Sequence, residues 1–232
     1  MARVKDFWEY LGWERPAAAR QPRLVRFGRL ELEAVVAESQ RAYFDEAQRS
    51  SAMAGLVLPR FREVMSGVLL AGHEGGLDTE QEEVFHQMVR GHGEWTDDAF
   101  YREGSVLFHA SRVRGLLWNE RAFRYESSWM TAEEVRRYDV GWLKEGGWVR
   151  LWEVGERCPQ LLVDFYGRRY AELPDFVQRH GRFCLPVEGR VVPLSWGVKY
   201  AFDICALAGK RSFRGSRSYV GRLAEVYRGP WA

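Results

Sequence analysis

The chain has 232 residues, of which 46% are hydrophobic and 14% aromatic, and its formal net charge at pH 7 is +2. No apolar run reaches the roughly 18 residues that cross a bilayer as a helix, so the composition excludes a membrane-spanning protein and predicts a soluble or peripheral one. The three cysteines, Cys158, Cys184 and Cys205, are too few and too widely spaced for a disulfide framework, which favours a reducing compartment.

The charges are unevenly distributed along the chain. Residues 1–30 carry seven basic and three acidic side chains, residues 207–232 carry six and one, and the remainder carries 21 and 28. An acidic body with two basic ends predicts arms that seek an anionic surface, namely RNA, anionic lipid or an acidic neighbouring subunit. We therefore divide the chain into an N-terminal amphipathic helix and basic arm (1–29), a single mainly helical body (30–207) and a basic Ser/Gly/Arg-rich C-terminal arm (208–232).

The first predicted element is an amphipathic helix over residues 3–12. Four apolar residues between Val4 and Leu11 share one face, with basic residues nearby. This pattern is similar to an organelle transit peptide, but Asp6, Glu9 and Glu14 favour an ordinary amphipathic helix. A mitochondrial location is the leading prediction on this evidence, and the cytoplasm and a virion are the alternatives.

Further helices are predicted in the first half of the chain. Residues 24–27 fit a short extended segment, and the apolar spacing indicates helices over 30–48 and 59–70, with a loop at 72–76. Asp78 and Gln81 then have the spacing of a capping box at the start of a helix that ends near residue 91.

Two more helix starts are indicated by polar residues. Thr96 is followed by Asp97 and Asp98, which suit the positive end of a helix dipole. Residues 105–114 fit either a strand or a helix. Thr131 and Glu134 have capping-box spacing and predict a helix to about residue 145 that buries Trp142.

The remaining pattern completes a mainly α prediction. It indicates a strand over 148–154, helices over 159–170, 174–181 and 195–207, and a β-hairpin near 183–194 that turns at Glu188–Gly189. The predicted fold class is thus mainly α, or α+β with a small β component: an irregular helical domain with one β-hairpin and extended basic terminal arms.

No catalytic signature is present in the sequence. His86, His92 and Glu94 do not have the spacing of a zinc site, and Gly209–Lys210 lacks the other positions of a phosphate-binding loop. We assign no catalytic, cofactor-binding or metal residues. The sequence favours a non-catalytic role, although an active site assembled from distant residues is left open.

Two groups of residues are predicted to bind partners. In the first, Arg150 lies between Trp148 and Trp152, and a guanidinium between two indoles suits a contact surface. The second group interleaves basic and aromatic side chains, which neutralise phosphates and stack on bases. It consists of Lys210, Arg211, Phe213, Arg214, Arg217, Tyr219 and Arg222.

The composition as a whole favours a protein that docks onto others. Arginine outnumbers lysine by 30 to 4, and arginine with aromatic residues is typical of protein–protein interfaces, although a GC-rich genome explains the same bias. The leading hypothesis is a structural accessory subunit of a large multi-subunit complex, with other subunits as its partners. The alternative is an RNA-binding protein, associated with a ribosome or similar particle, that uses its arginine-rich arms.

Overall fold

The structure is a computed structural model. It describes residues 23–33, 41–53, 56–90, 95–122, 124–127, 130–196, 204–206, 213–214 and 227–228. The predicted N-terminal helix over 3–12 and most of both basic arms lie outside these residues.

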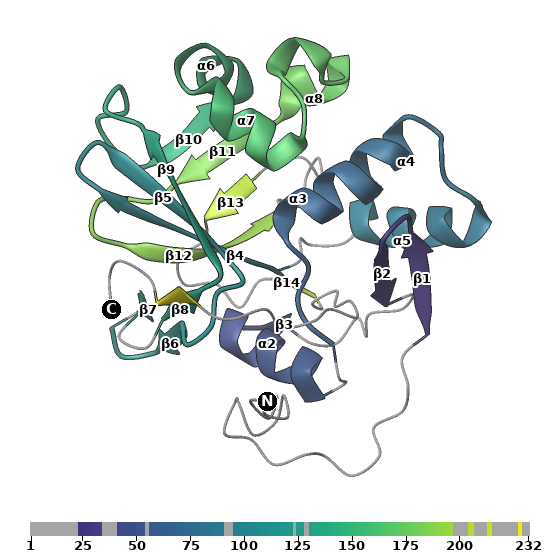
Figure 1. Cartoon of the computed structure of the whole chain (residues 1–232), viewed down its shortest axis with the longest axis horizontal. Coiled ribbons are helices and arrows are strands. Elements are labelled where there is room, and N and C mark those ends of the chain that lie inside the picture. Colours follow the sequence, from purple (N-terminus) through teal and green to yellow (C-terminus); the bar gives the residue numbers. More distant parts are fainter. Residues whose placement is uncertain are drawn as a thin grey trace, which may run out of the picture.

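A seven-stranded sheet forms the centre of the described chain, so the prediction of a mainly helical fold is wrong (Figure 1). Its strands, in spatial order, are β10 (Gly147–Arg150), β11 (Arg182–Leu185), β13 (Ile204–Ala206), β12 (Val191–Trp196), β4 (Trp95–Glu103), β5 (Val106–Ser111) and β9 (Glu134–Asp139). All neighbouring strands are antiparallel except β11 and β13, which are parallel.

Short strand pairs surround this sheet. They are β1 (Leu24–Phe27) with β2 (Leu30–Glu33), β6 (Leu117–Asn119) with β7 (Arg124–Glu126), β3 (Arg41–Ala42) with β14 (Phe213–Arg214), and β8 (Thr131–Ala132) with β15 (Tyr227–Arg228). The last two pairs join backbone segments near the C-terminus to strands from the first part and the middle of the chain.

The helices fall into groups around the sheet. Their bounds are α2 (Phe44–Met53), α3 (Phe61–Val64), the π-helical η1 (Met65–Leu70), α4 (Ala71–His73), α5 (Thr79–Arg90), α6 (Leu151–Arg157), α7 (Pro159–Tyr166), η2 (Tyr170–Glu172) and α8 (Asp175–His180). Figure 1 shows α6, α7 and α8 together at one end of the sheet, α3 to α5 beside the β1–β2 hairpin, and α2 at the opposite end from α6. No helix in the described part of the chain is both long and apolar enough to span a membrane.

The two faces of the sheet bury different side chains. On β4 and β5, Phe100 and His109 are cross-strand partners on one face, and the adjacent pair Ala99 and Ala110 lies on the other. The Phe100 face belongs to the larger core, which includes residues of α3, α6 and α7. The Ala99 face belongs to a smaller core with α2. Alternation along a strand sorts the side chains in this way.

Several predicted elements are confirmed. The extended segment 24–27 is β1, the helix predicted over 59–70 is the run of α3, η1 and α4, and α5, α7 and α8 lie close to their predicted positions. The capping box of α5 is also confirmed, because Asp78 accepts a hydrogen bond from the Gln81 backbone and donates its own backbone N–H to the Gln81 side chain.

The helices predicted after Thr96 and over 131–145 are wrong, because strands β4, β8 and β9 occupy these positions. The polar residues that suggested helix caps have other partners. Asp98 binds His109 on β5, Asp97 binds Arg114 in the segment after β5, and Glu134 binds Arg136 on its own strand. Trp142 therefore does not lie on a helix; it is half-buried in the turn after β9.

The β-hairpin predicted near 183–194 is wrong because of the order of the strands in the sheet. The strands predicted at 183–194 exist, but β13 lies between them, so they do not form a hairpin. Pro193 lies in β12, which is an interior strand of the sheet, and the register of β12 with β4 shifts between Pro193 and Ser195. Such a bulge is where an interior strand tolerates proline. The helix predicted over 195–207 is wrong, because the described residues at its two ends belong to strands: Ser195 and Trp196 to β12, and Ile204–Ala206 to β13.

Two further predictions need correction. The helix expected over 30–48 is replaced by β2 and β3, with α2 beginning only at Phe44. The strand expected over 148–154 stops at Arg150, and α6 begins at Leu151. Residues 105–114, which were left open, contain the strand β5.

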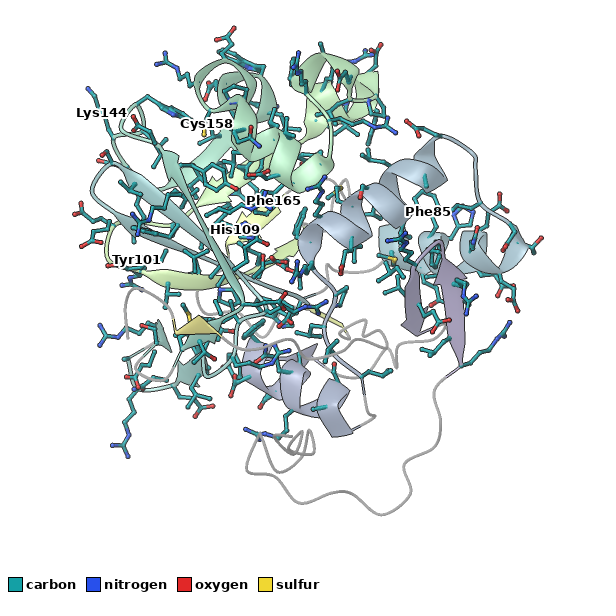
Figure 2. The ribbon with its side chains drawn as sticks, in the orientation of Figure 1. Phe85, Tyr101, His109, Lys144, Cys158 and Phe165 are labelled. Carbon is teal, nitrogen blue, oxygen red and sulfur yellow. The ribbon has the colours of Figure 1, made fainter. Side chains whose placement is uncertain are left out.

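Replacing Gly72 with alanine should destabilise the protein by about 1–3 kcal/mol, as inserted atoms do in a packed interior. A Cβ atom at this position would lie 2.4 Å from Cδ2 of Phe85, whose ring packs against the core (Figure 2). Gly67, in η1 of the same helical run, has open space around its would-be Cβ atom. Gly67→Ala should therefore be neutral or slightly stabilising in urea unfolding. Equal effects of the two substitutions would contradict this packing.

Candidate functional site

The first candidate site lies at the β10 edge of the sheet. Trp148 and Arg150 alternate with the buried Val149 on β10, and Trp152 follows in the first turn of α6. The indoles of Trp148 and Trp152 are 49% and 46% exposed. Local structure explains this exposure, because the strand buries every second residue and the helix then buries Leu151 and Val154.

Neighbouring side chains extend this region into a surface. The guanidinium carbon of Arg182, on β11, lies 4.5 Å from the ring centre of Trp148. Val187 is 49% exposed, and its backbone lies against Gly146 just before β10. We call the set of Trp148, Arg150, Trp152, Arg182 and Val187 the edge surface.

The predicted residues of the C-terminal arm cannot be placed on this surface. Lys210, Arg211, Arg217, Tyr219 and Arg222 lie outside the described residues. For Phe213 and Arg214 the structure describes only the backbone, which pairs with β3. The binding of RNA by this arm therefore stays a prediction.

The second candidate site is a cluster around Asp98 on β4. The Asp98 side chain is buried, and its Oδ1 accepts hydrogen bonds from His109 Nε2 (2.9 Å) and Ser111 Oγ (2.8 Å). Its Oδ2 accepts the backbone N–H of Phe61 at 2.5 Å. Burial alone raises the pKa of Asp98, but these hydrogen bonds and the charge of His109 outweigh burial and hold the pKa below its ordinary value.

This cluster does not have the arrangement of a nucleophilic serine site. A nucleophilic serine needs a hydrogen bond to the base that accepts its proton. Here Ser111 donates to Asp98, and its Oγ is 3.5 Å from His109 Nε2. The His109 ring lies 4.5 Å from the ring of Phe165, centre to centre (Figure 2), and its Nδ1 has no hydrogen-bond partner in the described part of the chain.

A small polar cavity adjoins the cluster. Its volume is about 80 Å³, and it is lined by Arg60, Arg62, Asp98, His109, Ser111, Glu134, Arg136, Asp164 and Phe165. The three arginines equal the three carboxylates in number. Most of them are paired: Arg60 binds Glu133 at 2.7 Å, and Arg136 binds Asp164 at 2.5 Å.

These ion pairs join the helices to the sheet. Arg60 precedes α3 and Glu133 precedes β9, whereas Arg136 on β9 binds Asp164 on α7. Tyr138 also donates to Asp164 at 2.6 Å. Burial raises the pKa of Asp164, but this hydrogen bond, with those of Gln160 and Arg136, brings it below its ordinary value. The charges of the lining are thus balanced, and its ion pairs hold α3 and α7 against the sheet.

Asp97 forms an ion cluster on the opposite face of β4, and Arg112 connects this cluster to Glu63 and Glu133, each at 3.9 Å. Asp97 accepts hydrogen bonds from Arg114 and from Gln48 of α2, and Arg112 lies at 3.4 Å. Burial raises the pKa of Asp97, and the two arginines oppose the rise. Two adjacent buried aspartates therefore anchor α3 on one side of the sheet and α2 on the other.

A wider cleft of about 560 Å³ lies between β4, β7 and the turn before β12. Arg124 and Arg190 line it together with Glu126 and Glu188, so its charges also balance. Tyr101, on the same wall, is tilted against Phe108 with ring centres 5.8 Å apart. Neither hollow has the excess of one charge that would select an ionic ligand.

No three His, Cys, Asp or Glu side chains are grouped as metal ligands among the described residues. His92 and Glu94 lie outside that part of the chain, so the structure does not test the prediction that they form no zinc site with His86. The Asp98 cluster was missed at the sequence level, because a Thr-Asp-Asp run also has the composition of a helix cap. His109 and Ser111 are two residues apart, which is the spacing of side chains on one face of a strand, and this was the available signal for a strand over 106–111.

Comparisons of the chain with protein-family models, with curated proteins and with solved structures found no match.

Proposed function

We propose that this chain is a non-catalytic binding subunit that docks onto a partner protein through the edge surface. The observation that carries the proposal is the pair of indoles, each nearly half exposed, on consecutive elements at the edge of the main sheet. Tryptophan and arginine are the residues that most often dominate binding energy at protein interfaces. Burial of the two indoles would have stabilised the protein. Their exposure is therefore unfavourable in the free chain, and binding of a partner would offset it.

The chemistry of the two hollows supports a role in binding over catalysis. The Asp98 cluster satisfies its carboxylate with three internal donors. The ion pairs beside it connect structural elements. The edge surface is different, because Arg150 makes no ion pair with any described residue and the side chain is exposed. The Arg150 charge and the exposed indoles of Trp148 and Trp152 therefore remain available to another molecule.

Trp148→Ala and Trp152→Ala should each weaken capture of the partner by about tenfold or more, in line with the loss of an interface hot spot. The free energy of unfolding should change by less than about 0.5 kcal/mol, as for other exposed positions. The measurement is affinity capture from extracts of the source cells with the full chain as bait, followed by reconstitution with the purified partner.

Leu117→Ala is the matched control for this experiment. Leu117 is 48% exposed, and its strand β6 lies at the opposite end of the molecule from β10 (Figure 1). Proteins retained by this variant but lost from both tryptophan variants are the partners. If capture is unchanged in the tryptophan variants and disappears after ribonuclease treatment, the docking proposal fails and RNA binding is favoured.

A further inference from the structure

We propose that the partner presents an extended acidic segment, which adds to β10 as a further strand of the sheet. This inference rests on the proposed function and specifies the chemistry of the partner at the same surface. The first observation is the position of β10. It stands at the end of the seven-stranded sheet and pairs only with β11 in the described part of the chain.

An edge strand presents a row of backbone N–H and C=O groups that can pair with another strand. β10 has four residues, and its register with β11 is regular from Gly147–Leu185 to Arg150–Arg182. Its outer side therefore has the geometry that accepts an extended segment by backbone hydrogen bonding. Such a segment would run past the exposed indole of Trp148.

The second observation is a pair of like charges. Arg150 and Arg182 are direct cross-strand partners, so their guanidinium groups share one face of the sheet. Like charges in this position destabilise a sheet. Arg182 lies over the Trp148 ring, and Arg150 is exposed without an ion pair among the described residues. A carboxylate from a bound segment would accept hydrogen bonds from the Arg150 guanidinium and offset this contact of like charges.

The same charges select against a second copy of this chain. Pairing of β10 with another β10 would place further arginines beside Arg150 and Arg182, and like-charge contacts across an interface are unfavourable. An acidic segment has the complementary charge. Because alternate residues of a strand face the same side, its carboxylates belong at every second position. Trp152, just beyond the end of β10, offers an apolar contact to a residue at the end of the segment.

The test uses fluorescent eight-residue peptides with blocked ends and the full chain, measured by fluorescence anisotropy. A peptide of alternating valine and glutamate should bind at least tenfold more tightly than its valine–lysine counterpart. Methylation of alternate backbone nitrogens, which removes donors without changing charge, should reduce binding by at least tenfold. Hydrogen exchange at the amides of residues 147–150 should slow when the glutamate peptide is bound.

A charge reversal provides the matched variant. Arg150→Glu should weaken binding of the glutamate peptide by at least tenfold and strengthen that of the lysine peptide. Because Arg150 is exposed, folding should be preserved, which a thermal melt verifies. Absence of binding, equal binding of both peptides, or equal binding of the methylated peptide would overturn the inference. Binding to vesicles containing an anionic phospholipid, without binding to the peptide, would overturn it as well.

The two proposals fail in different ways. If the partner is captured in a Trp148-dependent manner but the peptides do not bind, docking stands and strand addition is wrong. If capture does not depend on Trp148 or Trp152, the proposed function itself is wrong.

Discussion

Phe165→Ala is expected to lower the free energy of unfolding by about 3–5 kcal/mol, the range for truncation of a buried large aromatic. Phe165 lies on α7 and is almost fully buried. Its ring centre is 5.3–5.7 Å from those of Phe61, Phe100 and Phe183, so it joins α3, β4 and β11 in one aromatic cluster. Truncation would remove these contacts and leave a cavity at the point where three elements meet.

The measurement is urea unfolding followed by tryptophan fluorescence. Trp152→Ala is the control, because Trp152 lies in the first turn of the neighbouring helix α6 but is 46% exposed, and its loss should cost less than about 0.5 kcal/mol. A change below about 1 kcal/mol in Phe165→Ala would show that Phe165 of α7 is not packed against α3, β4 and β11.

Asp98→Ala should be comparably destabilising, by about 3–5 kcal/mol, because it removes a buried carboxylate that accepts three hydrogen bonds. The Ser111 hydroxyl, the His109 Nε2 and the Phe61 backbone N–H would lose their shared acceptor. Each buried donor left without a partner has a desolvation cost. The control is Asp175→Ala, because Asp175 is exposed and its pair with Arg179 should contribute less than about 1 kcal/mol.

The effect of Asp98→Ala should depend on pH in a defined direction. The folded pKa of Asp98 is below its ordinary value of about 3.9, so the unfolded chain takes up the proton first as the pH falls. The stabilisation by the carboxylate is therefore complete above about pH 4 and is lost as the pH falls through the folded pKa. Urea unfolding of both proteins across this range should show the difference between them shrinking. A difference that grows on acidification would contradict the assignment.

Local signals in the sequence predict the helices better than the strands. Asp78 and Gln81 define the start of α5, and Pro159 begins α7, because these effects operate within one turn of helix. The strands depend on distant partners. Asp97 and Asp98 look like helix-capping residues until Arg114 and His109 are placed beside them. No local pattern supplies that placement.

The candidate sites were predictable to different extents. Trp148, Arg150 and Trp152 of the edge surface are close in sequence, so the arginine and tryptophan spacing alone was enough to predict them. Arg182 could not be identified, because its position over Trp148 requires the pairing of β10 with β11. The Asp98 cluster draws on α3, β4 and β5, and only the register of β4 with β5 brings His109 and Ser111 to it.

The position of β13 has a consequence for the order in which the molecule can form. Strands β4, β5 and β9 follow one another closely in the chain, but β11 and β12 are joined only through β13, near residue 205. During synthesis the sheet would thus exist as two separate parts, each with an open edge, until β13 has left the ribosome. Pairings between distant segments form slowly and leave such edges exposed meanwhile. The nascent chain should depend on chaperones until β13 has been made and can pair with β11 and β12.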